Sequence, residues 1–287
     1  MNAQSRIAFP GEAGANSDEA CRAYFPHHQP IACPAFEDAF EAVKRGDCAL
    51  ALIPVENSIA GRVADVHHLL PASGLRIVGE RFKPIRFQLM ANPGVRLAEV
   101  RTVVSMAIAL GQCRKVLRRL GVRTETAGDT AGAAKALAAH PDPHRAVIAP
   151  ALAARLYGLD VLMTDVEDEA HNTTRFLVMS AEADPPAPPA GAPCLTSFAF
   201  RVRNIPAALY KALGGFATNG VNMTKLESYM EGGAFTATFF FAEVDGRPAD
   251  APLARALEEL AFFSDHLEIL GVFAADPFRA KGWAAPT

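Results

Sequence analysis

An arginine stands beside two threonines at the start of an apolar run, in the segment NTTRF at residues 172–176. A guanidinium can bind a carboxylate through two parallel hydrogen bonds, and neighbouring hydroxyls can add further donors. Because alternate side chains of a strand point to opposite faces, we expect Thr174 and Phe176 on one face and Thr173 and Arg175 on the other. A threonine-rich edge strand with a surface arginine explains the same residues equally well, so this segment leaves both interpretations open.

A second polar group follows an apolar run at residues 48–55, where Glu56, Asn57 and Ser58 stand in succession. Open α/β sheets bind their ligands at the carboxyl ends of parallel strands, which is where these side chains would lie. A simple cap on the following helix is the alternative interpretation of the same three residues.

The segment PGEAGANSDE at residues 10–19 joins an expected strand to an expected helix. Its two glycines would let a ligand approach the backbone, and Asn16 with Glu19 could form a capping box beside Ser17 that leaves other N–H groups free for an anion. A glycine-rich turn before a capped helix is the favoured interpretation, because the segment has neither a GxGxxG pattern nor the lysine of a phosphate-binding loop.

Ser105 and Gln112 are seven residues apart, at the end of an apolar run and on the helix that we expect over residues 110–120. Two helical turns could bring them toward one cleft, although a spacing of this size is common by chance. Asp129, before an alanine-rich segment, is most simply a helix N-cap. The eight histidines form no HExxH pattern, so we expect no metal site.

The elements that must position these residues belong to a chain of 287 residues, of which 50% are hydrophobic and 21% charged, as in folded globular proteins. A net charge of -3 argues against nucleic acid and anionic membrane surfaces as partners. Five cysteines without metal-ligand spacing indicate reduced thiols. With no signal-peptide pattern and no apolar stretch of about 20 residues that could span a bilayer, we expect a cytoplasmic protein.

A proline-rich segment, ADPPAPPAGAP at residues 183–193, divides the chain into two blocks and predicts an inter-domain linker. Before it, short apolar runs alternate with helical patterns, which predicts open, mostly parallel α/β sheets. Near residues 75–91 two strand-like runs follow each other directly, so the chain could cross there between two lobes and return near residues 163–176. A cleft would then lie between the lobes.

The second block predicts the order β-α-β-β-α-β, which is the ferredoxin-like arrangement. Pro206 suits the first position of its first helix, and Gly220 suits the position just after that helix ends. The strands are expected at residues 195–202, 221–229, 234–244 and 267–274, and the helices at residues 206–219 and 252–263.

In their order along the chain, the segments PGEAGANSDEA, IPVENSIAGRV, SMAIALGQC, GDTAGAAKAL, AARLYGL and NTTRFLVM resemble prephenate dehydratases. The segment PAALYKALGGFATNGVNMTKLESYM resembles the regulatory ACT domain of that family. The resemblance implies a two-lobed, periplasmic-binding-protein-like catalytic domain at 1–182, with lobes at 1–82 plus 166–182 and at 83–165. The linker at 183–193, an ACT domain at 194–276 and a tail at 277–287 would follow.

The family is a group of carbon-oxygen lyases that convert prephenate to phenylpyruvate, carbon dioxide and water in L-phenylalanine biosynthesis, without a cofactor. The resemblance implies that Thr174 donates a hydrogen bond to the leaving hydroxyl. The other catalytic residues that it implies are Glu56, Asn57, Ser105 and Gln112. The substrate-binding residues that it implies are Arg175, Thr173, Phe176, Asn16, Ser17 and Ser58.

The resemblance also implies feedback regulation by L-phenylalanine at the ACT domain and assembly into a dimer or tetramer. The allosteric residues would be Ala207, Ala208, Leu209, Asn222, Leu226, Glu227 and Ser228. The chain departs from the family pattern at Ala207, where glycine is frequent, and at Tyr229 and Met230, where Arg-Pro is frequent, so the strength of inhibition stays open. Phe87 and Met106 stand where the family often has histidine, so no histidine role transfers to them.

Two other functions remain open from the sequence. Arogenate dehydratases perform the same elimination on a substrate that carries an amino group, and sequence alone cannot show which substrate is recognised. A two-lobed module that binds a small molecule without catalysis is the alternative from a different class of protein.

Overall fold

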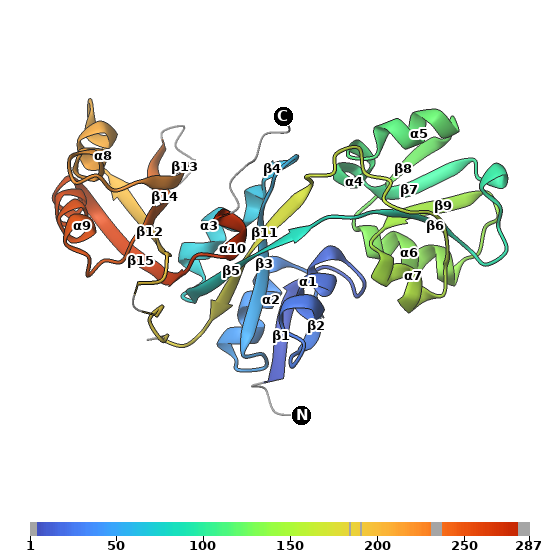
Figure 1. The fold of residues 1–287 in the computed structure, drawn as a ribbon, viewed down its shortest axis with the longest axis horizontal. Coiled ribbons are helices and arrows are strands. Elements are labelled where there is room, and N and C mark those ends of the chain that lie inside the picture. Colours follow the sequence, from blue (N-terminus) through green and yellow to red (C-terminus); the bar gives the residue numbers. More distant parts are fainter. Residues whose placement is uncertain (1–4, 184, 190, 231–236, 281–287) are drawn as a thin grey trace. The chain divides into compact units, whose positions relative to one another are not determined.

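The structure is a computed structural model that describes residues 5–183, 185–189, 191–230 and 237–280 (Figure 1). The chain divides into two compact units, one of residues 1–63 and 81–176 and the other of residues 64–80 and 177–287. The division passes through two strands, β5 (Arg76–Pro84) and β11 (Thr173–Ser180). Each unit is described below by itself.

The first sheet has the strand order β2-β1-β3-β11-β5, with the short β4 beside β3. Strand β1 runs parallel to both of its neighbours, β2 and β3, as the alternation of strands with helices predicted. Ile7, Ala8 and Phe9 of β1 are buried and pack against helices α1 and α2. The bounds are β1 Arg6–Pro10, α1 Asn16–Tyr24, β2 Gln29–Cys33, α2 Phe36–Lys44, β3 Leu50–Asn57 and β4 Gly61–Arg62.

The second sheet has the order β10-β6-β9-β7-β8 and is mixed. β7 is parallel to β8 and β9, whereas β6 is antiparallel to β9 and β10, so the prediction of mostly parallel sheets is wrong here. The prediction rested on a regular alternation of strands and helices, and this alternation is interrupted where β6 follows β5 directly through residues 85–87. The strands are β6 Gln88–Ala91, β7 Thr102–Met106, β8 Arg123–Ala127, β9 Arg145–Ala149 and β10 Asp160–Met163.

Four helices pack on the second sheet. The prediction for two of them was wrong. The single helix expected over residues 110–120 is two helices, interrupted at Gln112 and Cys113. Asp129 caps α6 as predicted, because its carboxylate accepts a hydrogen bond from the backbone N–H of Gly132 at 2.7 Å. The bounds are α4 Ala107–Gly111, α5 Arg114–Leu120, α6 Thr130–Ala139 and α7 Ala151–Tyr157.

The start of α1 also differs from its prediction. Its N-cap is Ala15, and Asn16 is the first helical residue, so the capping box between Asn16 and Glu19 is absent. The carboxylate of Asp18 instead accepts the backbone N–H of Gly14 at 2.8 Å. The Glu19 carboxylate cannot complete a capping box because it accepts the backbone N–H of Leu152 instead, at 2.9 Å.

The segment after the linker forms the predicted order β12-α8-β13-β14-α9-β15 in one antiparallel sheet, arranged β13-β14-β12-β15. Four aromatic rings, of Phe198, Phe200, Phe216 and Phe240, stack in its core beneath α8 and α9. The bounds are β12 Cys194–Val202, α8 Ala208–Thr218, β13 Met223–Met230, β14 Ala237–Asp245, α9 Ala251–Phe263 and β15 Ser264–Ala274.

Helix α8 begins two residues later than its predicted start at Pro206. Ala207, with φ of 61°, occupies the left-handed region and forms the N-cap, after a turn in which Ala208 N–H bonds to the Ile205 carbonyl. The prediction for the other end is confirmed, because Gly220 has φ of 66° just after the helix.

The same unit contains α3 (Ala64–Ala72), the first part of β5 and α10 (Pro277–Ala280). β15 approaches β5 so closely that a Cβ atom on Gly271 would overlap the carbonyl oxygen of Ile77, so this position requires glycine. α10 is tied to β5 by two ion-pair contacts between Arg279 and the buried Glu80, at 2.6 and 2.8 Å.

The described residues of the predicted linker form neither helix nor strand, and residues 184, 190 and 281–287 lie outside the described part of the chain. Among the described helices, none combines the length and the apolar character needed to cross a membrane.

Candidate active site

Three carboxamide side chains form a closed hydrogen-bonded ring. Asn57 ends β3, Gln112 follows the last residue of α4, and Asn172 immediately precedes β11. Asn57 Nδ2 donates to Asn172 Oδ1 at 2.8 Å, and Asn172 Nδ2 donates to Gln112 Oε1 at 3.0 Å. Gln112 Nε2 closes the ring by donating to Asn57 Oδ1 at 3.1 Å. Each amide is therefore both a donor and an acceptor, which fixes all three side-chain orientations.

The hydroxyl of Thr174 is attached to this ring. Asn57 Nδ2 donates to Thr174 Oγ1 at 3.0 Å. Asn57 is itself held by the backbone N–H groups of Ile59 and Ala60, which donate to its Oδ1 at 3.0 and 2.8 Å. Since the Thr174 oxygen accepts a hydrogen bond from a fixed amide, its own proton is directed elsewhere and can be donated to another acceptor.

Arg175 and Glu56, each one residue along its strand from Thr174 and Asn57, form an ion pair, with Arg175 Nη1 3.1 Å from Glu56 Oε2. The arginine side chain is 5% exposed, and the glutamate side chain is 34% exposed. A buried guanidinium needs a paired partner, and Glu56 supplies one from the neighbouring strand.

Ser58 and Thr173 link the end of β3 to the start of β11. The Ser58 hydroxyl donates to the carbonyl of His171 at 3.0 Å and accepts the backbone N–H of Thr173 at 3.0 Å. The Thr173 hydroxyl donates to the same His171 carbonyl at 3.1 Å. Phe176 is fully buried one strand residue beyond Arg175.

Three of the predicted site residues lie apart from the ring. Ser105 is fully buried in β7, and its hydroxyl donates to the carbonyl of Ile148 at 2.6 Å. Asn16 and Ser17 form the first turn of α1, where Ser17 is buried and the Asn16 side-chain oxygen is buried without a hydrogen-bond partner. The structure therefore joins Asn57, Gln112 and Thr174, but brings neither Ser105 nor the α1 residues into hydrogen-bond contact with them.

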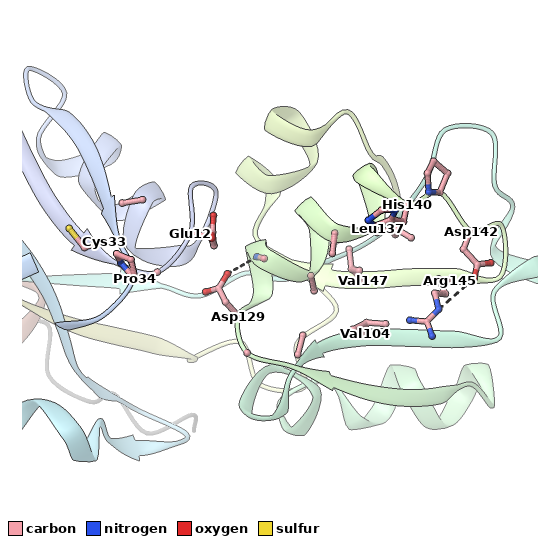
Figure 2. Close-up of a pocket in the computed structure, with 18 residues that line it drawn as sticks. Glu12, Cys33, Pro34, Val104, Asp129, Leu137, His140, Asp142, Arg145 and Val147 are labelled. Atoms are coloured by element: carbon pink, nitrogen blue, oxygen red, sulfur yellow. Dashed lines mark hydrogen bonds and ion pairs between the residues drawn. The ribbon is translucent and has the colours of Figure 1, made fainter. Parts of the chain in front are cut away.

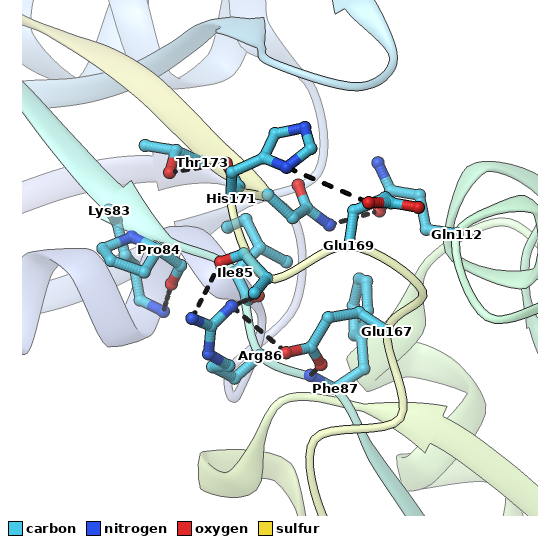
Figure 3. Close-up of polar contacts among 12 residues, drawn as sticks. Lys83, Pro84, Ile85, Arg86, Phe87, Gln112, Glu167, Glu169, His171 and Thr173 are labelled. Carbon is cyan, nitrogen blue, oxygen red and sulfur yellow. Dashed lines mark hydrogen bonds and ion pairs between the residues drawn. The ribbon is translucent and has the colours of Figure 1, made fainter. Parts of the chain in front are cut away.

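The segment between β10 and β11, residues 164–172, supplies site residues that the sequence interpretation missed. It runs beside residues 85–87, where Ile85 N–H donates to the Asn172 carbonyl at 2.8 Å. Arg86 pairs with Glu167 at 3.1 Å, and Figure 3 shows the two side chains directed at each other. Asn172 opens the NTTRF segment, so its position among polar residues was the only available signal.

Phe87 and Met106, which stand where the family often has histidine, lie in the core and at a helix start. Phe87 is buried in the core of the second sheet, and its N–H donates to Glu167 Oε2 at 2.9 Å. Met106 is the N-cap residue of α4 and its side chain forms no cap hydrogen bond.

A cavity of about 1070 Å³ lies in the same unit, away from the carboxamide ring. Figure 2 shows Glu12, from the loop after β1, and Cys33, at the end of β2, on one side of it, and Leu137 of α6 and Val147 of β9 on the other. Asp129 also lines it, and burial raises the pKa of that carboxyl above its ordinary value. The residues that line it do not include Thr174 or the ring amides.

The described residues hold no group of three or more His, Cys, Asp or Glu side chains that could bind a metal ion. All five cysteines are buried, unpaired thiols. The polar groups around Thr174 are the three amides of the ring, and the Arg175–Glu56 ion pair lies on the same two strands.

The residues expected to form a regulatory site lie on α8 and β13 of the second unit. Ala208 is buried and Leu209 packs against the core, after the left-handed Ala207. Leu226 and Ser228 are exposed on β13. The other two make polar contacts: Asn222 donates to Asp245 at 2.8 Å, and Glu227 accepts from Lys225 at 3.2 Å.

Comparison with known proteins gives consistent matches. The model of the prephenate dehydratase family matches residues 7–184. A Komagataeibacter europaeus protein named bifunctional N-acyl-homoserine lactone acylase/prephenate dehydratase is 48% identical over 98% of this chain and 100% of its own length. Arogenate dehydratase 2 of Petunia hybrida is 35% identical over 94% of this chain and 72% of its own.

Among solved structures, prephenate dehydratase from Arthrobacter aurescens, determined in complex with L-Phe, superposes with a TM-score of 0.86. It is 29% identical, and the match covers 94% of this chain and 90% of the other. The similarity extends through both units and includes the two-lobed fold of the first.

Proposed function

Because this chain belongs to the prephenate dehydratase family, we propose that it converts prephenate to phenylpyruvate, carbon dioxide and water. The observation that carries the proposal is the Thr174 hydroxyl, which accepts a hydrogen bond from Asn57 at 3.0 Å within the ring of amides. A hydroxyl held in this way is a fixed donor, which is what the departure of a hydroxyl group requires.

The chemistry explains why amides and hydroxyls suffice. The bond between ring carbon C1 and its carboxylate breaks, carbon dioxide leaves, and that electron pair moves through the ring and expels the hydroxyl from C4. The leaving oxygen takes up one proton from the solvent and departs as water, so one proton is consumed for each prephenate converted. Formation of the aromatic ring drives both bond cleavages, so the proposed reaction needs no electron sink and no cofactor.

We assign Thr174 the role of hydrogen-bond donor to the leaving oxygen. An aliphatic hydroxyl is too weak an acid to protonate this group in advance, so its contribution is a hydrogen bond that strengthens as negative charge develops. Asn57 and Gln112 keep the donor oriented before the reaction, which avoids reorganisation in the transition state. Glu56 positions Arg175 through their ion pair. Ser105 has a structural role in this proposal, because its hydroxyl bonds β7 to the Ile148 carbonyl.

We assign recognition of the substrate carboxylates to Arg175, because a guanidinium can bind a carboxylate through two parallel hydrogen bonds. The remaining residues proposed to contact the substrate or shape its site are Thr173, Phe176, Ser58, Asn16 and Ser17.

We further propose that residues 1–182 form the catalytic domain and residues 194–276 an ACT domain that binds L-phenylalanine and inhibits the enzyme. The β-α-β-β-α-β order supports this, as does the similarity to the Arthrobacter aurescens enzyme, whose structure contains L-Phe. The exposed edge strand β13 favours side-by-side pairing into a dimer or tetramer. Titration calorimetry with L-phenylalanine tests the site, and absence of binding to the active enzyme would contradict it.

The five unpaired thiols favour a reducing compartment, and we place the enzyme in the cytoplasm on that ground.

Two relatives suggest other substrates. The Petunia hybrida relative is named for arogenate, and the Komagataeibacter europaeus relative is also named for N-acyl-homoserine lactones. The test is to measure kcat/KM of the purified protein for prephenate, arogenate and an N-acyl-homoserine lactone. We expect the highest value for prephenate. Prephenate binding without phenylpyruvate formation would instead support a binding module, and a higher kcat/KM for either other compound would replace the proposed substrate.

A further inference from the structure

Asp168 binds the backbone on both sides of the break between α4 and α5. Its two carboxylate oxygens accept the N–H groups of Arg114 and Lys115, each at 2.9 Å. Its own backbone N–H donates to the carbonyl of Gln112 at 2.6 Å. One residue therefore satisfies the first free N–H groups of α5 and fixes the backbone of the residue that follows α4.

The two carboxylate contacts leave Asp168 little rotational freedom. Each oxygen is committed to a different backbone N–H group, and negative charge is favourable at the start of a helix. Lys115 adds a fourth contact, because its ammonium group donates to the Asp168 carbonyl at 2.9 Å. The segment that contains Asp168 is thus attached to α5 through both its side chain and its main chain.

The consequence falls on Gln112. Its backbone is held by Asp168, and its side chain contributes the amide that bonds to Asn57 and Asn172. A glutamine side chain has three rotatable bonds, so the position of its amide depends on where its backbone is held. Asp168 and Asn172 belong to the same segment, so this segment holds Gln112 at both ends.

We propose that Asp168 is a positioning residue for the elimination, acting through Gln112 on the amide ring that orients Thr174. The inference rests on the proposed turnover of prephenate. Asp168 lies four residues before Asn172, and it is assigned no contact with the substrate.

The test compares kcat and KM of the Asp168→Ala and Asp168→Asn variants with those of the wild type. Displacement of a catalytic group by about 1 Å can lower the rate by about a hundredfold, so we expect kcat of Asp168→Ala to fall by up to that factor with KM unchanged. The kcat of Asp168→Asn should lie between those of Asp168→Ala and the wild type, because the single amide oxygen of asparagine can accept only one of the two N–H groups. If Asp168→Ala does not fold, Asp168→Asn alone carries the comparison.

Glu99→Ala is the matched control. The Glu99 carboxylate also accepts a backbone N–H, that of Arg96 at 2.8 Å, at a short turn packed beside the second sheet. We expect its kcat to equal that of the wild type.

A double-variant cycle separates positioning from stability. If Asp168 acts through Gln112, adding Asp168→Ala to a Gln112→Ala protein should lower kcat no further. Additive losses would overturn the proposal, as would wild-type kcat in Asp168→Ala. A wild type that does not turn over prephenate would overturn the proposed function as well, so the two failures are distinguishable.

Discussion

At the scale of single residues, the site relies on fixed dipoles more than on charge. Three amides hold one another in a ring, and one of them also donates to Thr174. Amides do not titrate near neutral pH, so the orientation of the Thr174 hydroxyl is independent of protonation within the ring. This arrangement suits a reaction in which the enzyme must stabilise charge that develops on a leaving oxygen.

Asn172→Ala should destabilise the protein and slow it. Asn172 is 1% exposed, and its loss would remove a hydrogen-bond partner from both Asn57 and Gln112. A buried polar group left unsatisfied costs about 1–3 kcal/mol, so we expect a loss of that size in the unfolding free energy measured with urea. Asn222→Ala, at an exposed amide, should change it by less than about 0.5 kcal/mol. Equal stability of the two variants would contradict the buried ring.

Asp129 should make stability depend on pH. Burial raises the pKa of its carboxyl above the ordinary value of 3.8, so the folded state binds this proton more tightly than the unfolded state. Its contribution to the unfolding free energy therefore falls as pH rises through the window above 3.8. Asp129→Asn keeps an N-cap oxygen but cannot titrate, so its stability relative to wild type should increase across that window.

For Glu99→Gln, we expect the stability relative to wild type to change with pH in the opposite direction. Hydrogen bonds from the side chain and backbone of Arg96 lower the pKa of Glu99 from 4.5 to about 2. The stabilising contribution of this carboxylate is lost as pH falls, so Glu99→Gln should lose stability relative to wild type as pH rises through that range. Urea unfolding at successive pH values measures both variants, and slopes of the same sign would contradict the assignment.

Much of the site could be predicted because its residue types are distinctive. Glu56 and Asn57 follow one apolar run and Thr174 begins another, and in the structure Asn57 and Thr174 are hydrogen-bonded to each other. Gln112 joins them, whereas Ser105, expected beside it, bonds within its own sheet. Ser105 lies in β7 and Gln112 follows α4, so their spacing of seven residues could not predict whether the two side chains point the same way.

At the scale of elements, the apolar runs predicted most of the strands and helices, and the break in residues 110–120 escaped prediction. The apolar spacing of Leu110, Val116 and Leu117 continues across the break, so the sequence pattern is that of one helix. The carboxylate that caps α5 comes from Asp168, more than fifty residues later. A helix end set by so distant a partner leaves no local signal.

Substituting alanine for two neighbouring glycines of α8 should change the stability of the protein in opposite directions. A Cβ atom at Gly214 meets nothing within 4 Å, whereas one at Gly215 would lie 2.9 Å from the Cβ atom of Glu259 on α9. Gly214→Ala should stabilise the helix by about 0.5–1 kcal/mol, because alanine loses less conformational entropy than glycine. Gly215→Ala should destabilise by about 1–3 kcal/mol through overpacking. Thermal unfolding measures both, and a shared sign would contradict the packing of α8 on α9.

At the scale of the whole molecule, the chain combines a two-lobed unit with a ferredoxin-like one, and the order of elements in each follows from its sequence pattern. The attachment of α10 was not predicted, because it depends on the ion pair between Arg279 and Glu80, which are 199 residues apart. Contacts at such separations are fixed by the folded chain and have no periodicity in the sequence.

Arg279→Ala should destabilise the second unit. Glu80 is fully buried, and Arg279 makes two contacts with its carboxylate. Removing one partner of a buried ion pair costs about 3 kcal/mol, which urea unfolding can measure. Arg201→Ala, which removes an exposed pair with Asp265 in the same unit, should cost less than about 1 kcal/mol. A loss no larger than that of Arg201→Ala would contradict a structural role for the buried pair.

The most direct test of the whole account is the rate of phenylpyruvate formation from prephenate by the wild type and by Thr174→Val. Valine has the shape of threonine but no hydroxyl, and loss of a preorganised donor costs about 10²–10³ in kcat. We predict a fall of that size in a folded variant, retention of most activity in Thr174→Ser, and wild-type kcat in Thr218→Val, which removes a hydroxyl from α8. Wild-type kcat in Thr174→Val would contradict the central role of this hydroxyl.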